Sequence, residues 1–150
     1  MIQLNPAYES ADSITDLVKK GFLHALCDKI FHDGKQSIQL YRHQQDAIMK
    51  ALNDQHFIVT SGTGSGKSLT YLIPIFDHIL KHNPSEKKVH AIIVYPMNAL
   101  VNSQEKSIEK LLGNLGSSKD IIKVRKYTGQ ENDTQKRELQ ANPPHVILTN

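Results

Sequence analysis

Apolar side chains between Ile14 and Ile30 recur at roughly helical spacing, and Gly21 interrupts the run. Because residues three and four apart lie on one face of a helix, this pattern predicts two short helices broken near Gly21. The polar stretch HDGKQS that follows is typical of a connector. We therefore interpret residues 1–39 as an N-terminal helical accessory segment.

From residue 40 onward, the pattern changes to strand-like runs rich in β-branched residues, set apart by helical stretches. The strand-like runs are FIVTS (57–61), VHAIIVYP (89–96), IIKVRKY (121–127) and HVILT (145–149). Strands that alternate with helices predict parallel βαβ units with right-handed crossovers and helices on both faces of the sheet. The expected fold class is therefore α/β.

Helical spacing predicts the elements between these strands. The expected helices cover 41–54 (YRHQQDAIMKALND), 69–80, 100–115 and 132–140 (NDTQKRELQ). Pro74 lies inside the second of them. It should kink that helix or restrict its start, because proline removes one backbone donor and crowds the preceding turn.

The sequence SGTGSGKS, residues 61–68, stands between a predicted strand and a predicted helix. It follows the phosphate-loop pattern G-x-x-x-x-G-K-[ST], except that Ser61 replaces the first glycine. Its glycines let the backbone bend so that N–H groups point at phosphate oxygens. Lys67 supplies a positive charge for the terminal phosphates, Ser68 offers a hydroxyl to Mg²⁺, and the helix N-terminus adds partial positive charge. The alternative is a glycine-rich turn without a ligand.

The chain is mildly basic, with 18 Lys and Arg against 15 Asp and Glu and a formal net charge of +3. This balance is compatible with a polyanionic partner but does not by itself predict nucleic-acid binding. The single cysteine, Cys27, rules out an internal disulfide framework, and a buried unpaired thiol is its simplest interpretation. The sequence has no secretory-type start and no run near the ~18 apolar residues of a membrane span. We therefore expect a cytoplasmic protein with no membrane partner.

Eight histidines are scattered along the sequence, and only His78 and His82 have a metal-like spacing. No cysteine or carboxylate cluster accompanies them in the sequence. A solvated helix end is therefore favoured over a zinc site.

Four stretches, taken in order, resemble the first RecA-like domain of superfamily-two DEAD/DEAH-box helicases, and the resemblance covers residues 40–150. The first, YRHQQDAI, resembles the Q motif of that family. This implies that Gln44 contacts adenine, with Tyr41 and Arg42 near the ring. A side-chain amide carries both a donor and an acceptor, as recognition of adenine N6 and N7 demands. The alternative for Gln44 is a solvated amide on a helix surface.

Three later stretches resemble the motifs that contact nucleic acid. YPMNALVNSQ resembles motif Ia, with Met97 and Asn98 in place of the usual Thr and basic residue. YTGQE stands where the family has a glycine-containing motif. PPHVILTN resembles the approach to motif Ib. Strand ends and helix starts can present N–H groups to a nucleic-acid phosphate. The alternative is that these are ordinary strand-end turns and a packed crossover helix. The residues implied to bind nucleic acid are Pro96, Asn98, Ala99, Gln104, Thr128, Gly129, Thr149 and Asn150.

The resemblance implies ATP and Mg²⁺ as cofactors. It is strongest to large bacterial DNA helicases of defence and repair, so DNA is favoured over RNA. The helicase form of the loop tolerates a small residue at the position of Ser61. The implied cofactor-binding residues are Tyr41, Arg42, Gln44, Gly62, Thr63, Gly64, Ser65, Gly66, Lys67, Ser68 and Leu69, with Lys67 and Ser68 as the catalytic pair and Ser68 as the Mg²⁺ ligand.

Hydrolysis in this family also requires motif II, an Asp-Glu pair, and the sequence contains no Asp-Glu dipeptide. We therefore expect residues 40–150 to form a first RecA-like domain truncated before motif II, with an incomplete sheet and little hydrolysis alone. A C-terminal helicase domain or partner subunits would complete it. The expected function is the ATP-binding portion of an ATP-dependent nucleic-acid helicase or translocase. The alternatives are a non-catalytic nucleotide-binding or regulatory module and a small-molecule kinase in which Gln44 has no role.

Overall fold

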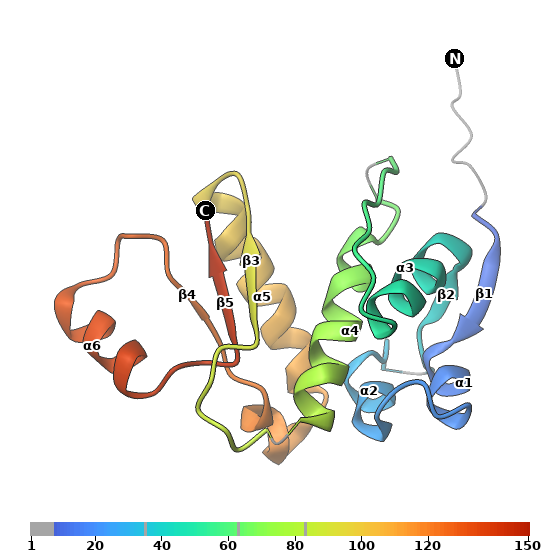
Figure 1. Ribbon diagram of the computed structural model, residues 1–150, viewed down its shortest axis with the longest axis horizontal. Helices are drawn as coiled ribbons and strands as arrows, with labels where there is room; N and C mark the ends of the chain where they lie inside the picture. The colour runs from blue at the N-terminus through green and yellow to red at the C-terminus, as the bar shows by residue number, and fades with distance from the viewer. Residues whose placement is uncertain (1–7, 35, 63, 83) are drawn as a thin grey trace. The chain divides into compact units, whose positions relative to one another are not determined.

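The computed structural model describes residues 8–34, 36–62, 64–82 and 84–150 (Figure 1). The chain divides into two compact units, Met1–Pro74 and Ile75–Asn150. No helix in the described ranges is long and apolar enough to cross a membrane.

The first unit begins with two short helices, as the sequence predicts. Helix α1 spans Ile14–Lys19 and helix α2 spans Ala25–Ile30. Between them Gly21 has φ +79°, a left-handed conformation that glycine adopts without strain. Ser13 caps α1 in a capping box with Asp16. The predicted break near Gly21 is therefore confirmed.

A small antiparallel ribbon, which the sequence pattern did not predict, joins the accessory segment to the following helix. Strand β1 (Ser10–Ser13) pairs with β2 (Gln39–Tyr41), and β2 leads directly into helix α3 (Arg42–Leu52). The backbone N–H of Asp12 also donates to the side chain of Gln45 on α3, at 2.7 Å. Neither strand shows strong alternation in sequence, which explains why the pattern gave no signal for them.

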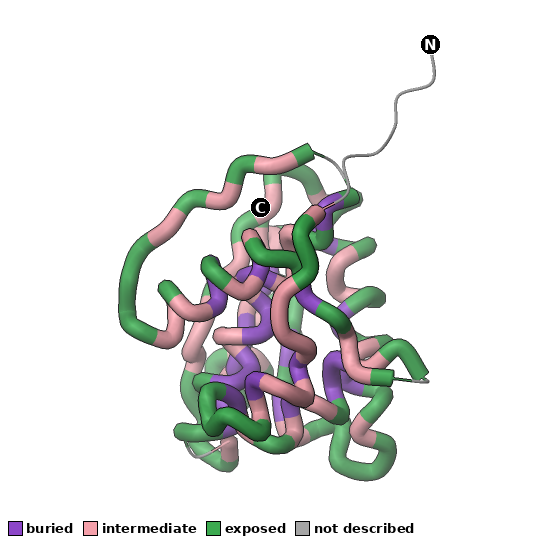
Figure 2. Tube along the Cα trace, turned by 90° about the vertical axis from the view of Figure 1, so that its right-hand side faces the viewer, coloured by how far each residue is buried: buried purple, intermediate pink, exposed green. Residues whose placement is uncertain are grey.

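The core of the first unit is built from helices α1, α2 and α3 and the ribbon. Cys27 is buried, as its simplest interpretation predicts. Figure 2 shows how buried positions alternate with exposed ones along the chain. The fully buried side chains of this unit include Ile14, Leu17, Ile30, Phe31, Leu40 and Ile48.

Helix α4 (Lys67–Lys81) follows the phosphate loop and contains Pro74. The helix continues through Pro74 as one segment, although proline has no N–H for the carbonyl of Thr70. Leu72, Ile73 and Phe76 are all buried. Packing of this apolar face is the physical reason that the helix tolerates one missing backbone hydrogen bond.

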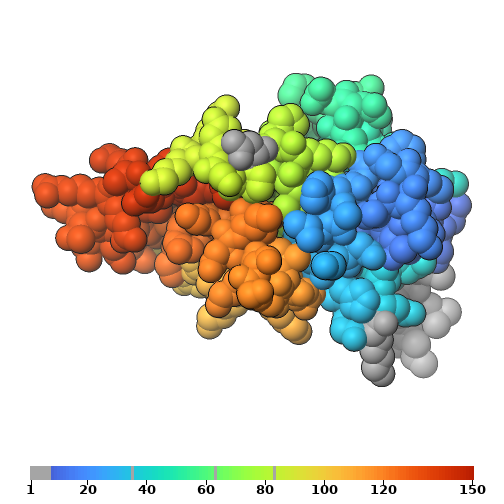
Figure 3. Space-filling model, turned by 90° about the horizontal axis from the view of Figure 1, so that it is seen from below, coloured from blue at the N-terminus to red at the C-terminus, as the bar shows by residue number. Residues whose placement is uncertain are grey.

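The second unit contains a parallel sheet of three strands in the order β3-β5-β4. The strands are β3 (Ala91–Val94), β4 (Val124–Lys126) and β5 (Val146–Thr149), as three of the predicted runs require. Between them lie α5 (Asn98–Gly113), the 3-10 helix η1 (Gly116–Ile121) and α6 (Asp133–Ala141). Helix α5 contacts β4 and β5. The space-filling view of Figure 3 shows the surface formed by η1 and the end of α5, coloured orange.

The predicted strand over 57–61 is wrong. Residues 56–62 have no strand conformation, and the side chain of Ile58 is 91% exposed. A strand requires a hydrogen-bonded neighbour, and no described strand pairs with this run. The run is rich in β-branched residues, but it has no strand partner among the described residues.

Candidate functional site

The phosphate loop of the first unit has the backbone form that its glycines predict. Gly64 and Gly66 have φ of +80° and +70°, which side-chain-bearing residues rarely adopt. Ser65 between them is fully buried. The hydroxyl of Ser61 lies 2.6 Å from that of Ser65. The residue that departs from the generic pattern thus closes the loop with a contact that a glycine could not make. Thr63 lies outside the described residues.

Lys67 folds back over the start of this loop. Its ammonium Nζ donates to the carbonyls of Ser61 and Gly62, at 2.9 and 2.6 Å. Among the described residues, no carboxylate lies within ion-pair distance of Lys67. Its positive charge is therefore held at the loop without a counter-charge, as an anion-binding lysine requires. Ser68 and Leu69 follow in the first turn of α4.

Gln44 of helix α3 lies against the phosphate loop, and only 2% of it is exposed. Its Nε2 donates to the carbonyls of Gly66 and Ser65, at 3.0 and 3.3 Å. Its Oε1 accepts from the backbone N–H of Tyr41, at 2.8 Å. The burial excludes the solvated surface amide that sequence reasoning kept as an alternative. The loop and the start of α3 are therefore fastened together by one side chain.

An aromatic cluster lies beside Gln44. The ring of Tyr8 has centroid distances of 5.2 Å to Tyr41 and 5.1 Å to His43. A ring nitrogen of His43 also lies 3.1 Å from the carbonyl of Ser65. Sequence reasoning missed Tyr8 and His43, because only the fold brings the N-terminal segment beside the loop. Arg42 instead forms an exposed ion pair with Glu9, 3.5 Å apart.

The residues of this loop fit a nucleoside triphosphate. Two left-handed glycines, an uncompensated lysine and the first turn of α4 together favour binding of phosphate oxygens. Few groups near the loop could bind a cation. Ser68 supplies one hydroxyl, and within the described ranges no group of three His, Cys, Asp or Glu residues is arranged to hold a metal ion.

The second unit brings together most of its predicted residues at one edge of the sheet. Val94 pairs with Thr149 in the parallel register, and Lys126 pairs with Leu148. All three strands therefore end at the same level, so the segments after β3 and β4 and the end of β5 lie side by side (Figure 1). These segments carry Pro96, Asn98, Thr128, Gly129, Thr149 and Asn150. Ala99 is exposed in the first turn of α5, whereas Gln104 is half-buried one turn later.

Thr128 does not present a free N–H at this edge. The Glu131 carboxylate accepts from the backbone N–H of Thr128, at 3.0 Å to each oxygen, and from its hydroxyl, at 3.2 Å. Burial raises the pKa of Glu131, but hydrogen bonds from the Thr128 and neighbouring N–H groups outweigh it and hold that pKa below its ordinary value. A carboxylate of the chain itself therefore occupies the donors that sequence reasoning assigned to a nucleic-acid phosphate.

Four histidines of the second unit form a chain of ring contacts that their scattered positions in sequence did not predict. Ring centroids lie 4.1 Å apart for His78 and His82, 5.5 Å for His78 and His90, and 6.0 Å for His90 and His145. His78 and His82 are exposed at the end of α4, whereas His145 is buried. Burial lowers the pKa of His145 and, together with the neighbouring His145, that of His90.

Comparison with known proteins gives consistent results. Residues 41–150 match the family model described as DEAD/DEAH box helicase. The chain is 36% identical over 110 residues to the ATP-dependent helicase hrq1 of Schizosaccharomyces pombe, covering 73% of this chain and 10% of that protein. It is 32% identical over 105 residues to the Druantia protein DruE of Escherichia coli, covering 60% of this chain and 6% of that protein.

Solved structures share the fold. The DUF1998 helicase MrfA bound to DNA and AMPPNP has a TM-score of 0.76 at 18% identity, over 95% of this chain and 18% of that one. The DEAD-box helicase Mss116 bound to ssRNA and UDP-BeF has a TM-score of 0.77 at 20% identity, over 95% of this chain and 29% of that one. The predicted RecA-like α/β fold is thus confirmed, and the chain spans only a small part of these relatives. The sequence match and the fold together show that this chain belongs to the DEAD/DEAH box helicase family.

Proposed function

We propose that this chain is the ATP-binding portion of an ATP-dependent helicase or translocase that acts on nucleic acid, with DNA favoured over RNA. The observation that carries the proposal is the contact of buried Gln44 with the phosphate loop. A generic phosphate loop has no need of a buried amide from a preceding helix. Its presence favours a nucleotide site that couples base recognition to phosphate binding.

The loop residues would hold the triphosphate. Lys67 would move its ammonium from the carbonyls of Ser61 and Gly62 onto terminal phosphate oxygens. Backbone N–H groups from Gly64 to Leu69 would surround the remaining phosphates. Mg²⁺, when bound with ATP, would neutralise phosphate charge, and Ser68 is the residue that would contact it.

Gln44 retains capacity for adenine after its internal contacts are made. Its two N–H groups face the carbonyls of Ser65 and Gly66, and its Oε1 accepts one hydrogen bond from Tyr41. A carbonyl oxygen has a second lone pair, which suits the N6 amino group of adenine. The half-exposed ring of Tyr41 lies nearby and offers a face to the base.

The carboxyl edge of the three-stranded sheet would carry the nucleic acid. Its segments after β3 and β4 and at the end of β5 present small and polar groups suited to a phosphodiester backbone. The structure of MrfA bound to DNA and that of a Mycobacterium smegmatis Lhr helicase bound to ssDNA and AMP-PNP support DNA as the substrate. In the complete protein, a second helicase domain would close on ATP and open after hydrolysis, so that the pair steps along one strand.

Equilibrium binding tests the proposal. The chain should bind both ATP and single-stranded DNA, and Lys67→Ala should weaken ATP binding about ten- to a hundredfold while DNA binding persists. A chain that binds neither ligand would contradict the proposal. The sequence contains no Asp-Glu pair, so we expect little ATP turnover by this chain alone.

A second candidate function follows from the same missing Asp-Glu pair: a non-catalytic module that binds nucleotide or a protein partner. A steady-state ATPase assay with and without single-stranded DNA separates the two. DNA-stimulated turnover by the chain would exclude the non-catalytic module. A third candidate, a small-molecule kinase, leaves the burial of Gln44 without a role.

A further inference from the structure

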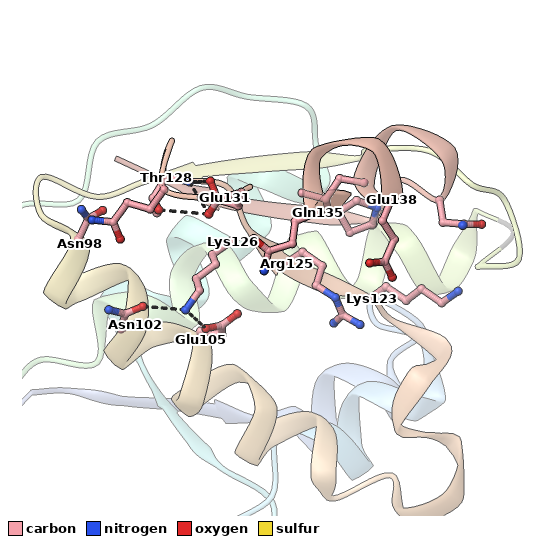
Figure 4. A pocket seen from close by; sticks show the side chains of 14 residues that line it. Asn98, Asn102, Glu105, Lys123, Arg125, Lys126, Thr128, Glu131, Gln135 and Glu138 are labelled. Atoms are coloured by element: carbon pink, nitrogen blue, oxygen red, sulfur yellow. Dashed lines mark hydrogen bonds and ion pairs between the residues drawn. The ribbon is translucent and has the colours of Figure 1, made fainter. Parts of the chain in front are cut away.

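A polar cleft of about 650 Å³ opens beside the carboxyl edge of the sheet, between α5, β4 and α6 (Figure 4). Its volume falls in the range of roughly 300–1,000 Å³ that small-ligand sites occupy. Asn98 and Thr128 stand on its wall, so the cleft adjoins the proposed nucleic-acid edge. Five amide side chains line it: Asn98, Asn102, Gln130, Gln135 and Asn142.

Three of the six charged side chains that line the cleft are already engaged by neighbouring groups of the chain. Lys126 bonds to Asn102 and pairs with Glu105, at 3.1 and 3.3 Å. The Glu131 carboxylate is held by Thr128. These contacts hold Lys126, Glu105 and Glu131 in place on one side of the cleft (Figure 4). Their charges are therefore partly satisfied within the chain.

Lys123 just before β4, Arg125 on β4 and Glu138 on α6 also line the cleft. Within the described residues, no carboxylate lies at ion-pair distance from Lys123 or Arg125. Arg125 donates to the carbonyl of Val124, at 3.0 Å, and this bond holds its planar guanidinium along the strand.

This mixture of groups suits a nucleobase better than a phosphate. A phosphate site would present a surplus of cations, whereas here three cations face three carboxylates and five amides. Amides and carboxylates match the donors and acceptors on base edges. A guanidinium plane stacks on a base, and Leu139 and Pro144 add apolar contact.

We propose that the cleft between α5, β4 and α6 receives a nucleobase of a single strand whose backbone crosses the carboxyl edge of the sheet. The inference rests on the proposed nucleic-acid function and deepens it. Arg125 would stack on the base, while Glu138 and the amides would hydrogen-bond its edge. Base contact there would add affinity that a backbone alone does not supply.

Two probes of equal length test this: a strand of thymidine nucleotides and a strand whose residues lack bases. The variant is the double substitution Arg125→Ala with Glu138→Ala, which leaves the net charge unchanged. The matched control is Lys110→Ala with Glu109→Ala, an exposed pair outside the cleft with the same charge balance. All four substitutions are made in the full 150-residue chain.

The cleft variant should bind the thymidine strand about three- to tenfold more weakly, the loss expected for one or two hydrogen bonds or a stacking contact. It should bind the abasic strand as well as the unmodified chain does, and the control should match the unmodified chain on both strands. Unchanged binding of the thymidine strand, or an equal loss on both strands, would overturn the inference. If the unmodified chain binds neither strand, the proposed function itself fails.

Arg125→Lys is a second variant in case the double variant unfolds, as judged by its thermal unfolding. It keeps the charge but removes the planar group. Weaker binding of the thymidine strand alone supports stacking by the guanidinium, whereas equal affinity for both strands contradicts it.

Discussion

The phosphate loop of the first unit and the carboxyl edge of the second unit, for which we propose anion-binding roles, are organised in opposite ways. In the loop, the ligand-binding groups are held by buried side chains, with Gln44 and Ser65 almost fully enclosed. At the edge, the candidate groups stand on exposed turns, and Glu131 covers one set of donors. We infer that the loop is preorganised, whereas the edge would have to exchange an internal contact for a ligand.

The largest effect should come from Lys67→Ala. Removing a charged partner of the triphosphate should weaken ATP binding by roughly 1.5–3 kcal/mol, or about ten- to a hundredfold. Titration with a fluorescent ATP analogue measures it. If the variant binds ATP within about twofold of the affinity of the unmodified chain, the loop is not the ATP-binding site.

Gln44→Ala should destabilise the first unit. The substitution removes the side-chain partner of the Tyr41 N–H and one of the two groups that contact the buried carbonyl of Ser65, the other being the ring of His43. The free energy of unfolding should fall by about 1–3 kcal/mol, measured by urea denaturation. The half-buried Gln104 on α5 is the matched control, and Gln104→Ala should change stability by less than about 0.5 kcal/mol. Equal effects would mean that the two regions are not differently organised.

Acidification should destabilise the second unit through the buried His145 and the half-buried His90. The folded pKa values of His145 and His90 lie below the ordinary value of about 6.5. Because the unfolded chain then binds more protons, the free energy of unfolding is at its full value above about pH 6.5 and falls as the pH drops below it.

Urea denaturation between about pH 5 and pH 7.5 measures this dependence. The Nδ1 of His145 accepts from the N–H of Lys123, at 3.0 Å, so protonation also costs that bond. His145→Asn should flatten the pH dependence. If the free energy of unfolding of the His145 variant depends on pH as strongly as before, other groups cause the dependence.

The smallest effect should come from Glu131→Ala, which frees the N–H of Thr128 for a phosphate. Binding of single-stranded DNA should strengthen by about two- to fivefold, as one hydrogen bond of about 0.5–1 kcal/mol allows. Glu109→Ala removes the same charge from an exposed position on α5 and should have less effect. Weaker DNA binding by the Glu131 variant would mean that its carboxylate organises the turn rather than covering it.

The two regions also differ in how far the sequence predicts them. The phosphate loop was predictable because its glycines, Lys67 and Ser68 lie within one short stretch of sequence. The backbone form of such a loop depends on these residues themselves and not on distant contacts. The parallel strands β3, β4 and β5 were predictable from composition and alternation. The strand expected at 57–61 failed because a strand depends on a neighbour that local sequence does not reveal.

Contacts between distant residues were beyond sequence reasoning. Tyr8 beside Tyr41, the N–H of Asp12 on the side chain of Gln45, and the ring contact of His90 with His145 all depend on tertiary structure. None has a periodic or motif signal. The resemblance to a helicase family did indicate Gln44, but only the structure shows that both ends of its amide are bound to the backbone.

The account depends most directly on Gln44 acting as the link between base and phosphate loop. The measurement that tests this is the ratio of ATP to GTP affinity for the unmodified chain and for Gln44→Ala, each checked for folding. We predict that the unmodified chain prefers ATP by about fivefold or more, since one base-edge contact contributes roughly 1–3 kcal/mol, and that Gln44→Ala binds both nucleotides equally. An ATP preference that persists unchanged in the variant would contradict the account.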